Sequence, residues 1–251
     1  MTRVARMLAE AQVATMLLTR LPAGTIKGDV PSLAEARWAY PVVGLPLGLF
    51  AYAVHSAAMG LGASAAISAI LTILSLALLT GALHFDGLAD FADGLGGGRD
   101  KAHCLEIMRD SRIGSYGTLA LILLVGLWVA ALADIGSSVT LLHFLGVAML
   151  SRAAMVVLLE WMPAAREDGL GKSASGTGRA SGLALGGVIV FALLGLGWIG
   201  LGLVLVTAAI AVLVALAASR RIGGQTGDVL GATQALTEVG GWLFLSISLT
   251  F

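Results

Sequence analysis

Long apolar runs constrain this chain more than any other feature. Each has about 20 residues, the length that an α-helix needs to cross about 30 Å of hydrocarbon. Of the 251 residues 58% are hydrophobic and only 12% charged, a composition outside the range of soluble globular domains. The sequence predicts an all-α, polytopic integral membrane helical bundle of six to seven transmembrane helices, with 1–251 as a single membrane domain. The runs lie near 40–60, 63–84, 115–133, 138–159, 181–198 and 199–219.

The distribution of charge predicts how these spans are connected. The runs come in pairs, and within a pair the connection is short and nearly uncharged, at 60–64, 134–138 and 195–200. The connections between pairs are long and rich in Lys and Arg. Three hairpins would place every basic segment on one side of the bilayer, which the positive-inside rule assigns to the cytoplasm. We therefore expect a multi-pass protein of the bacterial inner membrane with its charged side in the cytoplasm.

The two ends of the chain are less clear-cut. Residues 3–19 mix apolar with charged side chains and are more typical of an interfacial amphipathic helix than of a span. Residues 229–251 are long enough to cross, and we predict a seventh span there, with Gln234 and Glu238 in its first half.

Composition also excludes some functions. Acidic and basic residues are 15 each, so there is no basic surface to indicate a nucleic-acid partner. Cys104 is the single cysteine, which excludes an internal disulfide.

Three aspartates follow the second apolar run, in the stretch HFDGLADFADGLGGG at 84–98. If the helix continues out of that span, Asp86, Asp90 and Asp93 have the spacing i, i+4, i+7 and share one face. Carboxylates so close repel one another unless a hard cation such as Mg²⁺, often completed by substrate phosphate, lies between them. The alternative is a solvated helix end beside a span. His84 would point away from the aspartates, as an interfacial residue rather than a ligand.

The next polar stretch, IMRDSRIGSYG at 107–117, places Arg109, Asp110, Ser111 and Arg112 just before the third span. Two arginines beside an acid and a hydroxyl are suited to bidentate capture of a phosphate. A basic membrane anchor would explain the arginines, but not the intervening Asp-Ser pair.

Two further places carry unusual polar residues. Arg152 lies inside the fourth span, where a charge indicates function by default, although its side chain could snorkel to the interface. Gln225, Thr226 and Asp228 stand in the glycine-rich RRIGGQTGDVLGA at 220–232, a composition suited to hydrogen-bonding a polar ligand but also to an ordinary loop. The same holds for AREDGLG at 165–171.

Taken in order, these stretches resemble the cobalamin synthases, also described as adenosylcobinamide-GDP ribazoletransferases. The resemblance covers nearly the whole chain and is most specific between DGLAD and RDSRIGSYG. The matching pieces are TRLP at 19–22, YPVVGLPLG at 40–48, HFDGLADFADGLGGG at 84–98, IMRDSRIGSYG at 107–117, SR at 151–152, AREDGLG at 165–171 and GGQTGDVLGA at 223–232.

The resemblance implies a Mg²⁺-dependent membrane enzyme that joins α-ribazole, or its 5′-phosphate, to adenosylcobinamide-GDP and releases GMP. It would act in the lipid bilayer, in company with other enzymes of cobalamin assembly, and its oligomeric state stays open. On this basis we predict that Asp86, Asp90 and Asp93 hold the metal, with Asp86 and Asp90 catalytic, and that Asp110 is a further ligand or the base. The predicted substrate contacts are Arg109, Ser111, Arg112, Arg152, Arg20, Gln225, Thr226 and Asp228.

Two other functions fit parts of the pattern. A CDP-alcohol phosphotransferase also uses several helix-borne aspartates at the membrane edge, but its motif has an arginine where this chain has Asp90. A cation-coupled transporter would bind its ion with acids near the bilayer midplane, on interrupted helices in two repeated halves. This chain has its acids at the end of a span and no visible repeat.

Overall fold

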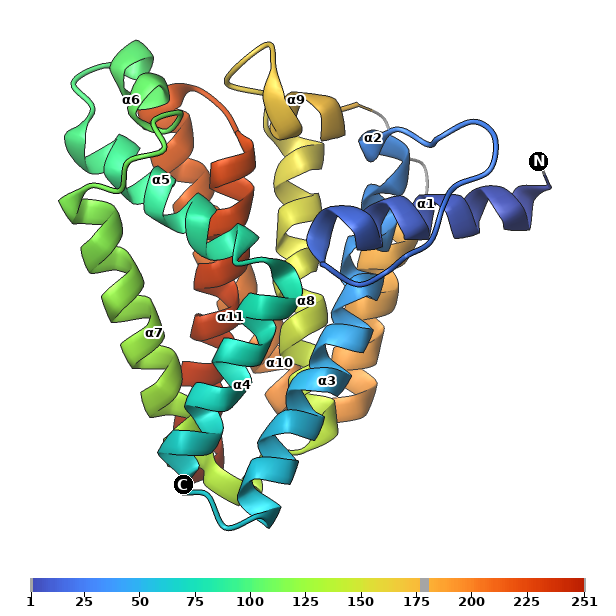
Figure 1. Ribbon diagram of the computed structural model, residues 1–251, viewed down its shortest axis with the longest axis vertical. Coiled ribbons are helices and arrows are strands. Elements are labelled where there is room, and N and C mark those ends of the chain that lie inside the picture. The colour runs from blue at the N-terminus through green and yellow to red at the C-terminus, as the bar shows by residue number, and fades with distance from the viewer. Residues whose placement is uncertain (1, 177–180, 251) are drawn as a thin grey trace.

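The chain folds into a helical bundle in the computed structural model, which describes residues 2–176 and 181–250 (Figure 1). All regular elements in these ranges are helices, apart from one isolated bridge between Ala164 and Gln225. The elements are α1 (Arg3–Leu18), α2 (Leu33–Ala36), η1 (Arg37–Ala39), α3 (Tyr40–Gly60), α4 (Ala65–Thr80), α5 (Leu83–Gly97), α6 (Lys101–Ile107), α7 (Ser115–Ile135), η2 (Gly136–Ser138), α8 (Leu141–Trp161), α9 (Gly169–Ala174), α10 (Ser181–Ile222) and α11 (Gly227–Thr250).

The predicted spans correspond to α3, α4, α7, α8, the two halves of α10, and α11. In the described ranges, four helical segments are long and apolar enough to cross a membrane, and the bent pair α4 and α5 makes a fifth if it is one span. The membrane-bundle prediction is confirmed. The four segments are Leu33–Gly60, Ser115–Ser138, Leu141–Trp161 and Ser181–Ile222. Helix α11 falls outside this set and packs against α5, α7, α8 and α10.

Helix α10 is two helices joined by a tight turn. Gly197 has φ +59° and ψ −129°, a backbone conformation that residues with a Cβ rarely adopt. A Cβ on Gly200 would lie 1.9 Å from the carbonyl oxygen of Ala192, so the chain beyond the turn packs back on the segment before it. This reversal is the third predicted hairpin.

The second predicted span differs from expectation, because α4 ends at Thr80 and α5 leaves it at 90°. Gly81 and Ala82 both adopt left-handed backbone conformations, with φ of +64° and +57°. Two such residues in succession stop a right-handed helix. The prediction of one helix that continues out of the span through the aspartates is therefore wrong, and the acidic helix α5 is a separate element.

The N-terminal helix lies across the bundle and projects from it (Figure 1). It is tied to the α2–η1 segment by an ion pair of 2.5 Å between Arg6 and Glu35, and by a hydrogen bond of 2.7 Å that Trp38 donates to Glu10. Its exposed side chains include Val4 and Leu8. An exposed apolar face is what an interfacial helix requires.

Two helix crossings are close because glycines remove the side chains between them. On α3, a Cβ at Gly44 or Gly48 would lie 2.6 or 2.8 Å from a backbone oxygen of α8, the small-xxx-small packing common in membrane bundles. Helices α5 and α11 cross at Gly87 and Gly231, where an added Cβ would lie 3.1 Å from the opposite Cα. The second crossing fixes the geometry of the site described next.

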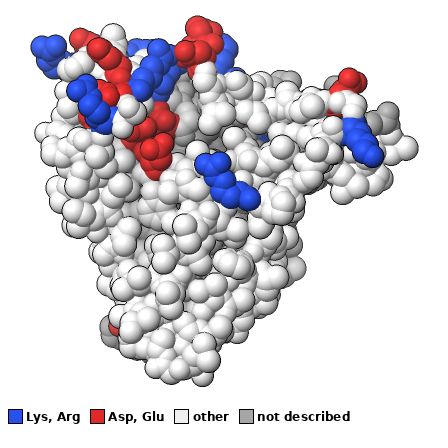
Figure 2. Space-filling view, in the orientation of Figure 1, with Lys and Arg blue, Asp and Glu red and all other residues white. Residues whose placement is uncertain are grey.

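Charged side chains gather at one end of the bundle, around α6 and α9, and the surface towards the other end is almost free of charge in this view (Figure 2). The uncharged turns between α3 and α4 and between α7 and α8 lie at that other end (Figure 1). This arrangement agrees with the three predicted hairpins.

Candidate active site at the charged end of the bundle

The close crossing of α5 and α11 brings together two motifs that are far apart in the sequence. HFDGLAD contributes Asp86, which is exposed, and Asp90, which is half-buried. GGQTGDVLGA contributes Asp228 from the first turn of α11. Asp90 lies within electrostatic reach of the other two carboxylates and of Arg166. The crossing therefore forms an acidic centre at the charged end of the bundle.

Asp93 has a different environment from the other aspartates of α5. Its two carboxylate oxygens accept hydrogen bonds from the backbone N–H groups of Gly114, at 2.7 Å, and Gly117, at 2.8 Å. These groups belong to the N-terminus of α7, where a carboxylate is favoured by the helix dipole and by donors without a partner inside the helix. Asp93 is only 7% exposed, so it caps α7 in this structure instead of lining an open metal site.

This contact also explains two glycines of the RIGSYG motif. A Cβ on Gly114 or on Gly117 would lie 2.3 Å from a carboxylate oxygen of Asp93, a distance that side chains do not tolerate. The motif is thus a backbone cradle for the Asp93 carboxylate. The sequence alone does not indicate these hydrogen bonds, because 21 residues separate Asp93 from Gly114.

The predicted three-carboxylate metal site is not formed as such. Across residues 2–176 and 181–250, no three His, Cys, Asp or Glu side chains are placed to hold a metal ion. The oxygen donors of Asp86 and Asp90 nevertheless fit Mg²⁺ chemically, because this ion uses one or two protein carboxylates and takes its other ligands from water and substrate phosphates.

Arg166 is the residue of the site that the sequence analysis did not single out. Its guanidinium forms an ion pair of 2.5 Å with Asp228 and is 14% exposed. Burial raises the pKa of the Asp228 carboxyl, and the charge of Arg166 opposes that shift. Its position within AREDGLG was the one available signal, and nothing in that motif alone distinguishes Arg166 from a loop arginine.

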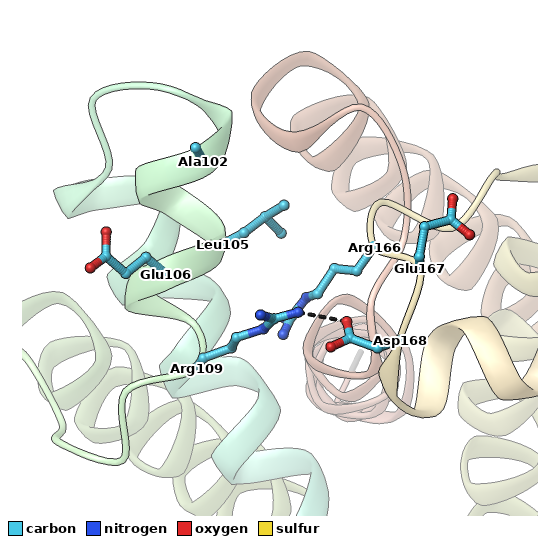
Figure 3. Close-up of a pocket in the computed structure, with 7 residues that line it drawn as sticks. All are labelled: Ala102, Leu105, Glu106, Arg109, Arg166, Glu167 and Asp168. Atoms are coloured by element: carbon cyan, nitrogen blue, oxygen red, sulfur yellow. Dashed lines mark hydrogen bonds and ion pairs between the residues drawn. The ribbon is translucent and has the colours of Figure 1, made fainter.

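An open cavity of about 620 Å³ lies between α6 and the segment before α9 (Figure 3). Arg109 and Arg166 extend into it from opposite sides, and their guanidinium groups converge (Figure 3). Arg109 also forms an ion pair of 2.5 Å with Asp168 across the cavity. Two converging guanidiniums are suited to a phosphate or diphosphate, which accepts hydrogen bonds from both. The lining residues are Ala102, Leu105, Glu106, Arg109, Arg166, Glu167 and Asp168.

The remaining residues of the RDSR segment do not line this cavity, and of these Ser111 and Arg112 are exposed and Asp110 is half-buried. Asp110 and Arg112 pair with each other at 2.5 Å, and Ser111 lies exposed between them. Hydrogen bonds from Arg112 lower the pKa of the Asp110 carboxyl to about 2. A carboxylate so weakly basic is poorly matched to proton abstraction near neutral pH, so the structure gives no support to Asp110 as the base.

Arg152 lies in the core of the bundle, where its contacts give no support to a phosphate contact. Its guanidinium lies 3.0 Å from the Glu238 carboxylate, and the two side chains are 2% and 5% exposed. Gln234 also donates a hydrogen bond to Glu238 and one to Ser151. The pair joins α8 to α11 inside the bundle, so the polar half predicted for the last helix is satisfied internally.

Gln225 and Thr226 shape the site without facing open space. Gln225 is 1% exposed, and its side-chain amide donates to the carbonyl oxygen of Gly171 and to Ser175, each at 3.0 Å. The Thr226 hydroxyl donates to Asp228 at 3.2 Å and accepts from the backbone N–H of Val229. Gln225 thus anchors the start of α11 to the AREDGLG segment and Thr226 stabilises the first turn of α11, and the structure gives no support to a direct substrate contact by either residue.

Arg20 and His84 lie near the break between α4 and α5. Arg20 is exposed, and its guanidinium covers Gly81, where an added Cβ would lie 2.3 Å from Nε. His84 is 4% exposed, which contradicts the prediction of an interfacial histidine. It lines the same small cavity as Asp86 and Asp228.

Comparison with known proteins supports one identity. A family model described as Cobalamin-5-phosphate synthase matches residues 10–246. The chain belongs to this family. It is 42% identical over 241 residues to the adenosylcobinamide-GDP ribazoletransferase of Bradyrhizobium diazoefficiens, covering 94% of this chain and 92% of the relative. It is 41% identical to the enzymes of the same name from Azorhizobium caulinodans (94% and 95% covered) and Sinorhizobium medicae (95% and 96%). No solved structure matches the chain.

Membership of the cobalamin-5-phosphate synthase family confirms the resemblance found in the sequence. The match spans both α5 and α11 and all the segments that form the acidic centre and the arginine-lined cavity. Neither the CDP-alcohol phosphotransferases nor the transporters are favoured by these comparisons.

Proposed function

We propose that this protein transfers the adenosylcobinamide-phosphate group of adenosylcobinamide-GDP to α-ribazole or its 5′-phosphate and releases GMP. The observation that carries the proposal is the α5–α11 crossing, which brings Asp86, Asp90 and Asp228 within electrostatic reach of one another and pairs Asp228 with Arg166, an arginine of the open cavity. Carboxylates for a cation and guanidiniums for phosphates are the groups that a transfer at a diphosphate requires. The names of the relatives supply the substrates.

In the proposed reaction, a ribose hydroxyl of the acceptor attacks the phosphorus atom that carries the cobinamide. The new P–O bond forms as the bond from that phosphorus to the GMP oxygen breaks, and the hydroxyl proton passes to a base. Positioning and charge neutralisation account for most of the rate in such transfers. The chain must therefore hold the two substrates in line and balance the phosphate charge.

The arginines are assigned to the donor. Arg109 and Arg166 each have a carboxylate partner, Asp168 and Asp228, at 2.5 Å. A diphosphate in the cavity would accept hydrogen bonds from both guanidiniums and weaken these two pairs. Release of Asp228 from Arg166 would leave a half-buried carboxylate with a raised pKa next to the reacting groups, so we assign Asp228, rather than Asp110, as the acceptor of the hydroxyl proton.

Mg²⁺ is the proposed cofactor, held by Asp86 and Asp90 together with substrate phosphate oxygens. When bound, the ion neutralises phosphate charge and makes GMP a better leaving group. The like charges of Asp86 and Asp228 around Asp90 support the presence of a cation there. We further propose that the charged end faces the cytoplasm of the bacterial inner membrane, where nucleotides and other cobalamin-assembly enzymes have access to it.

The test is transfer by the purified full-length protein in lipid vesicles supplied with adenosylcobinamide-GDP, α-ribazole and Mg²⁺. We expect GMP and the joined corrinoid to appear in equal amounts, and both to cease when Mg²⁺ is chelated. Asp86→Asn and Asp90→Asn should each abolish transfer, while Asp29→Asn, in an exposed N-terminal loop, should not. Full activity of Asp86→Asn would refute the site, and absence of GMP with the unaltered protein would refute the function.

A further inference from the structure

A second, smaller cavity of about 150 Å³ lies on the other side of the Arg166–Asp228 ion pair from the arginine-lined cavity. Asp228 lines the small cavity and Arg166 lines the large one. Asp86 stands on the wall of the small cavity as well. Any molecule seated there would therefore touch the acidic centre at one end.

The walls of the small cavity are mostly apolar. They come from six helices, α1, α3, α5, α8, α9 and α11, and include Leu18, Leu83, Met155, Leu170 and Leu230. No arginine or lysine is among the lining residues, and the two carboxylates would repel a phosphate. Apolar walls with a methionine favour a flat aromatic ring, since thioether sulfur packs well against ring edges.

Two residues that line this cavity, Tyr40 and His84, carry a buried polar atom without a hydrogen-bond partner among the described residues. Tyr40, at the start of α3, is 1% exposed, and its hydroxyl forms no hydrogen bond with the described protein atoms. Nε2 of His84 is also buried and unpartnered, but His84 borders a second narrow gap beside Arg152 and Glu238. Buried hydroxyls nearly always have a partner, because an unsatisfied one destabilises the fold by about 1–3 kcal/mol. The Tyr40 hydroxyl thus lacks the partner that a ligand in this cavity would supply.

We infer that the small cavity binds the flat heteroaromatic base of the acceptor nucleoside, with the Tyr40 hydroxyl hydrogen-bonded to a ring nitrogen. The inference rests on the proposed function and places the acceptor within it. A cavity of about 150 Å³ is well below the 300–1,000 Å³ of sites for whole drug-sized ligands, so it suits a ring system and not a complete nucleotide. With the base inside, the attached ribose lies at Asp86 and Asp228, next to the phosphates held by the arginines.

The experiment measures nucleoside binding separately from turnover. The full-length protein in lipid nanodiscs is titrated with α-ribazole in a calorimeter, without the corrinoid donor, and the transfer assay then gives KM for each substrate. Tyr40→Phe removes only the hydroxyl, and we expect it to weaken nucleoside binding about five- to tenfold. Ala174→Leu, which fills the cavity from α9, should weaken it more than tenfold.

Two control substitutions on α3 match the two test variants. Tyr52→Phe changes a tyrosine of α3 that packs on Phe144 away from the cavity, and Ala57→Leu adds the same side chain on an exposed face. Both should bind the nucleoside as the unaltered protein does, and thermal unfolding checks that every variant is folded.

The pattern of KM values distinguishes this inference from the proposed function. A raised KM for the nucleoside with an unchanged KM for adenosylcobinamide-GDP supports the inference. Normal nucleoside binding and KM in both Tyr40→Phe and Ala174→Leu would overturn it while leaving the function intact. Tyr40-dependent binding of α-ribazole by a protein that forms no GMP would support the cavity and refute the function. A higher KM for the donor alone would overturn the inference and assign the cavity to the corrinoid substrate.

Discussion

Replacing Asp93 tests whether this aspartate caps a helix or binds a metal. Asp93→Ala removes two charge-assisted hydrogen bonds, to the backbone N–H groups of Gly114 and Gly117 at 2.7 and 2.8 Å. Each such bond contributes about 1.5–3 kcal/mol, and water can reach the more exposed Gly114 once the carboxylate is gone. We therefore expect the variant to lose about 3 kcal/mol of unfolding free energy. For a chain of this size the loss corresponds to roughly 6–12 °C in Tm.

The assay is thermal unfolding of the purified protein in detergent, followed by tryptophan fluorescence, with and without Mg²⁺. Asp90→Ala is the matched control on the same helix. Asp90 makes no hydrogen bond to α7, and its removal relieves repulsion from neighbouring carboxylates, so its Tm should stay within a few degrees of the unaltered protein. The two variants should therefore differ: Asp93→Ala should lose stability, and Asp90→Ala should lose transfer activity.

A double-mutant cycle with Gly114 isolates the contact. The three atoms nearest to a Cβ on Gly114 all belong to Asp93, the closest at 2.3 Å, so Gly114→Ala should destabilise the protein by itself. In the Asp93→Ala background the same change should be nearly neutral, which gives a coupling of about 1–3 kcal/mol. Additive effects would refute the cap. If Asp93→Ala kept its stability but needed more Mg²⁺ for transfer, Asp93 would be a metal ligand, as the sequence predicted.

Three further experiments test the assignments of Arg166, of the Arg152–Glu238 pair and of Asp110. Arg166→Gln should lower transfer about a hundredfold or more, because it removes a hydrogen-bond donor to the phosphate and leaves the half-buried Asp228 without its ion-pair partner. Release of GMP measures this effect. Near-normal GMP release would argue against phosphate binding in the arginine-lined cavity. Glu238→Gln should lower the unfolding free energy by about 3 kcal/mol, because it leaves Arg152 buried without its partner. The double variant Arg152→Met/Glu238→Leu should recover most of that stability and keep transfer activity. Loss of transfer in the folded double variant would restore Arg152 as a phosphate contact. Asp110→Asn should leave the acidic limb of the pH–rate profile in place, because a carboxyl whose pKa is about 2 is already ionised throughout the assay range. Disappearance of the acidic limb in this variant would show that Asp110 is the titrating base.

The bundle could be predicted from the sequence because its signals are summed over many residues. An apolar run of about 20 residues is hard to bury in any other way than in a membrane or a large core. The hairpins followed from charge, since loops rich in Lys and Arg stay on one side. The turn at Gly197 fell inside the predicted connection at 195–200, where glycines mark a permitted reversal.

The site was less predictable, because its contacts join residues far apart in the chain. Helix periodicity placed Asp86, Asp90 and Asp93 on one stripe, but only the packing of α7 shows that the third faces a helix end. Nothing in the sequence indicates that Arg152 meets Glu238, 86 residues later. No proline or polar cap marks the break at Ala82 in the sequence. The residue at the second left-handed position is an alanine, which rarely adopts this conformation.

The shortness of α4 has a consequence for the surrounding lipid. Its 16 residues span about 24 Å at 1.5 Å per residue, roughly 6 Å less than an average hydrocarbon core, and the chain then turns aside instead of continuing straight. Hydrophobic mismatch of this kind draws the bilayer surface inwards at the shortened helix. The membrane should therefore be thinnest beside the α4–α5 bend, so that water and headgroups reach the start of the acidic helix. Transfer activity should accordingly be higher in vesicles of short-chain lipids than in those of long-chain lipids.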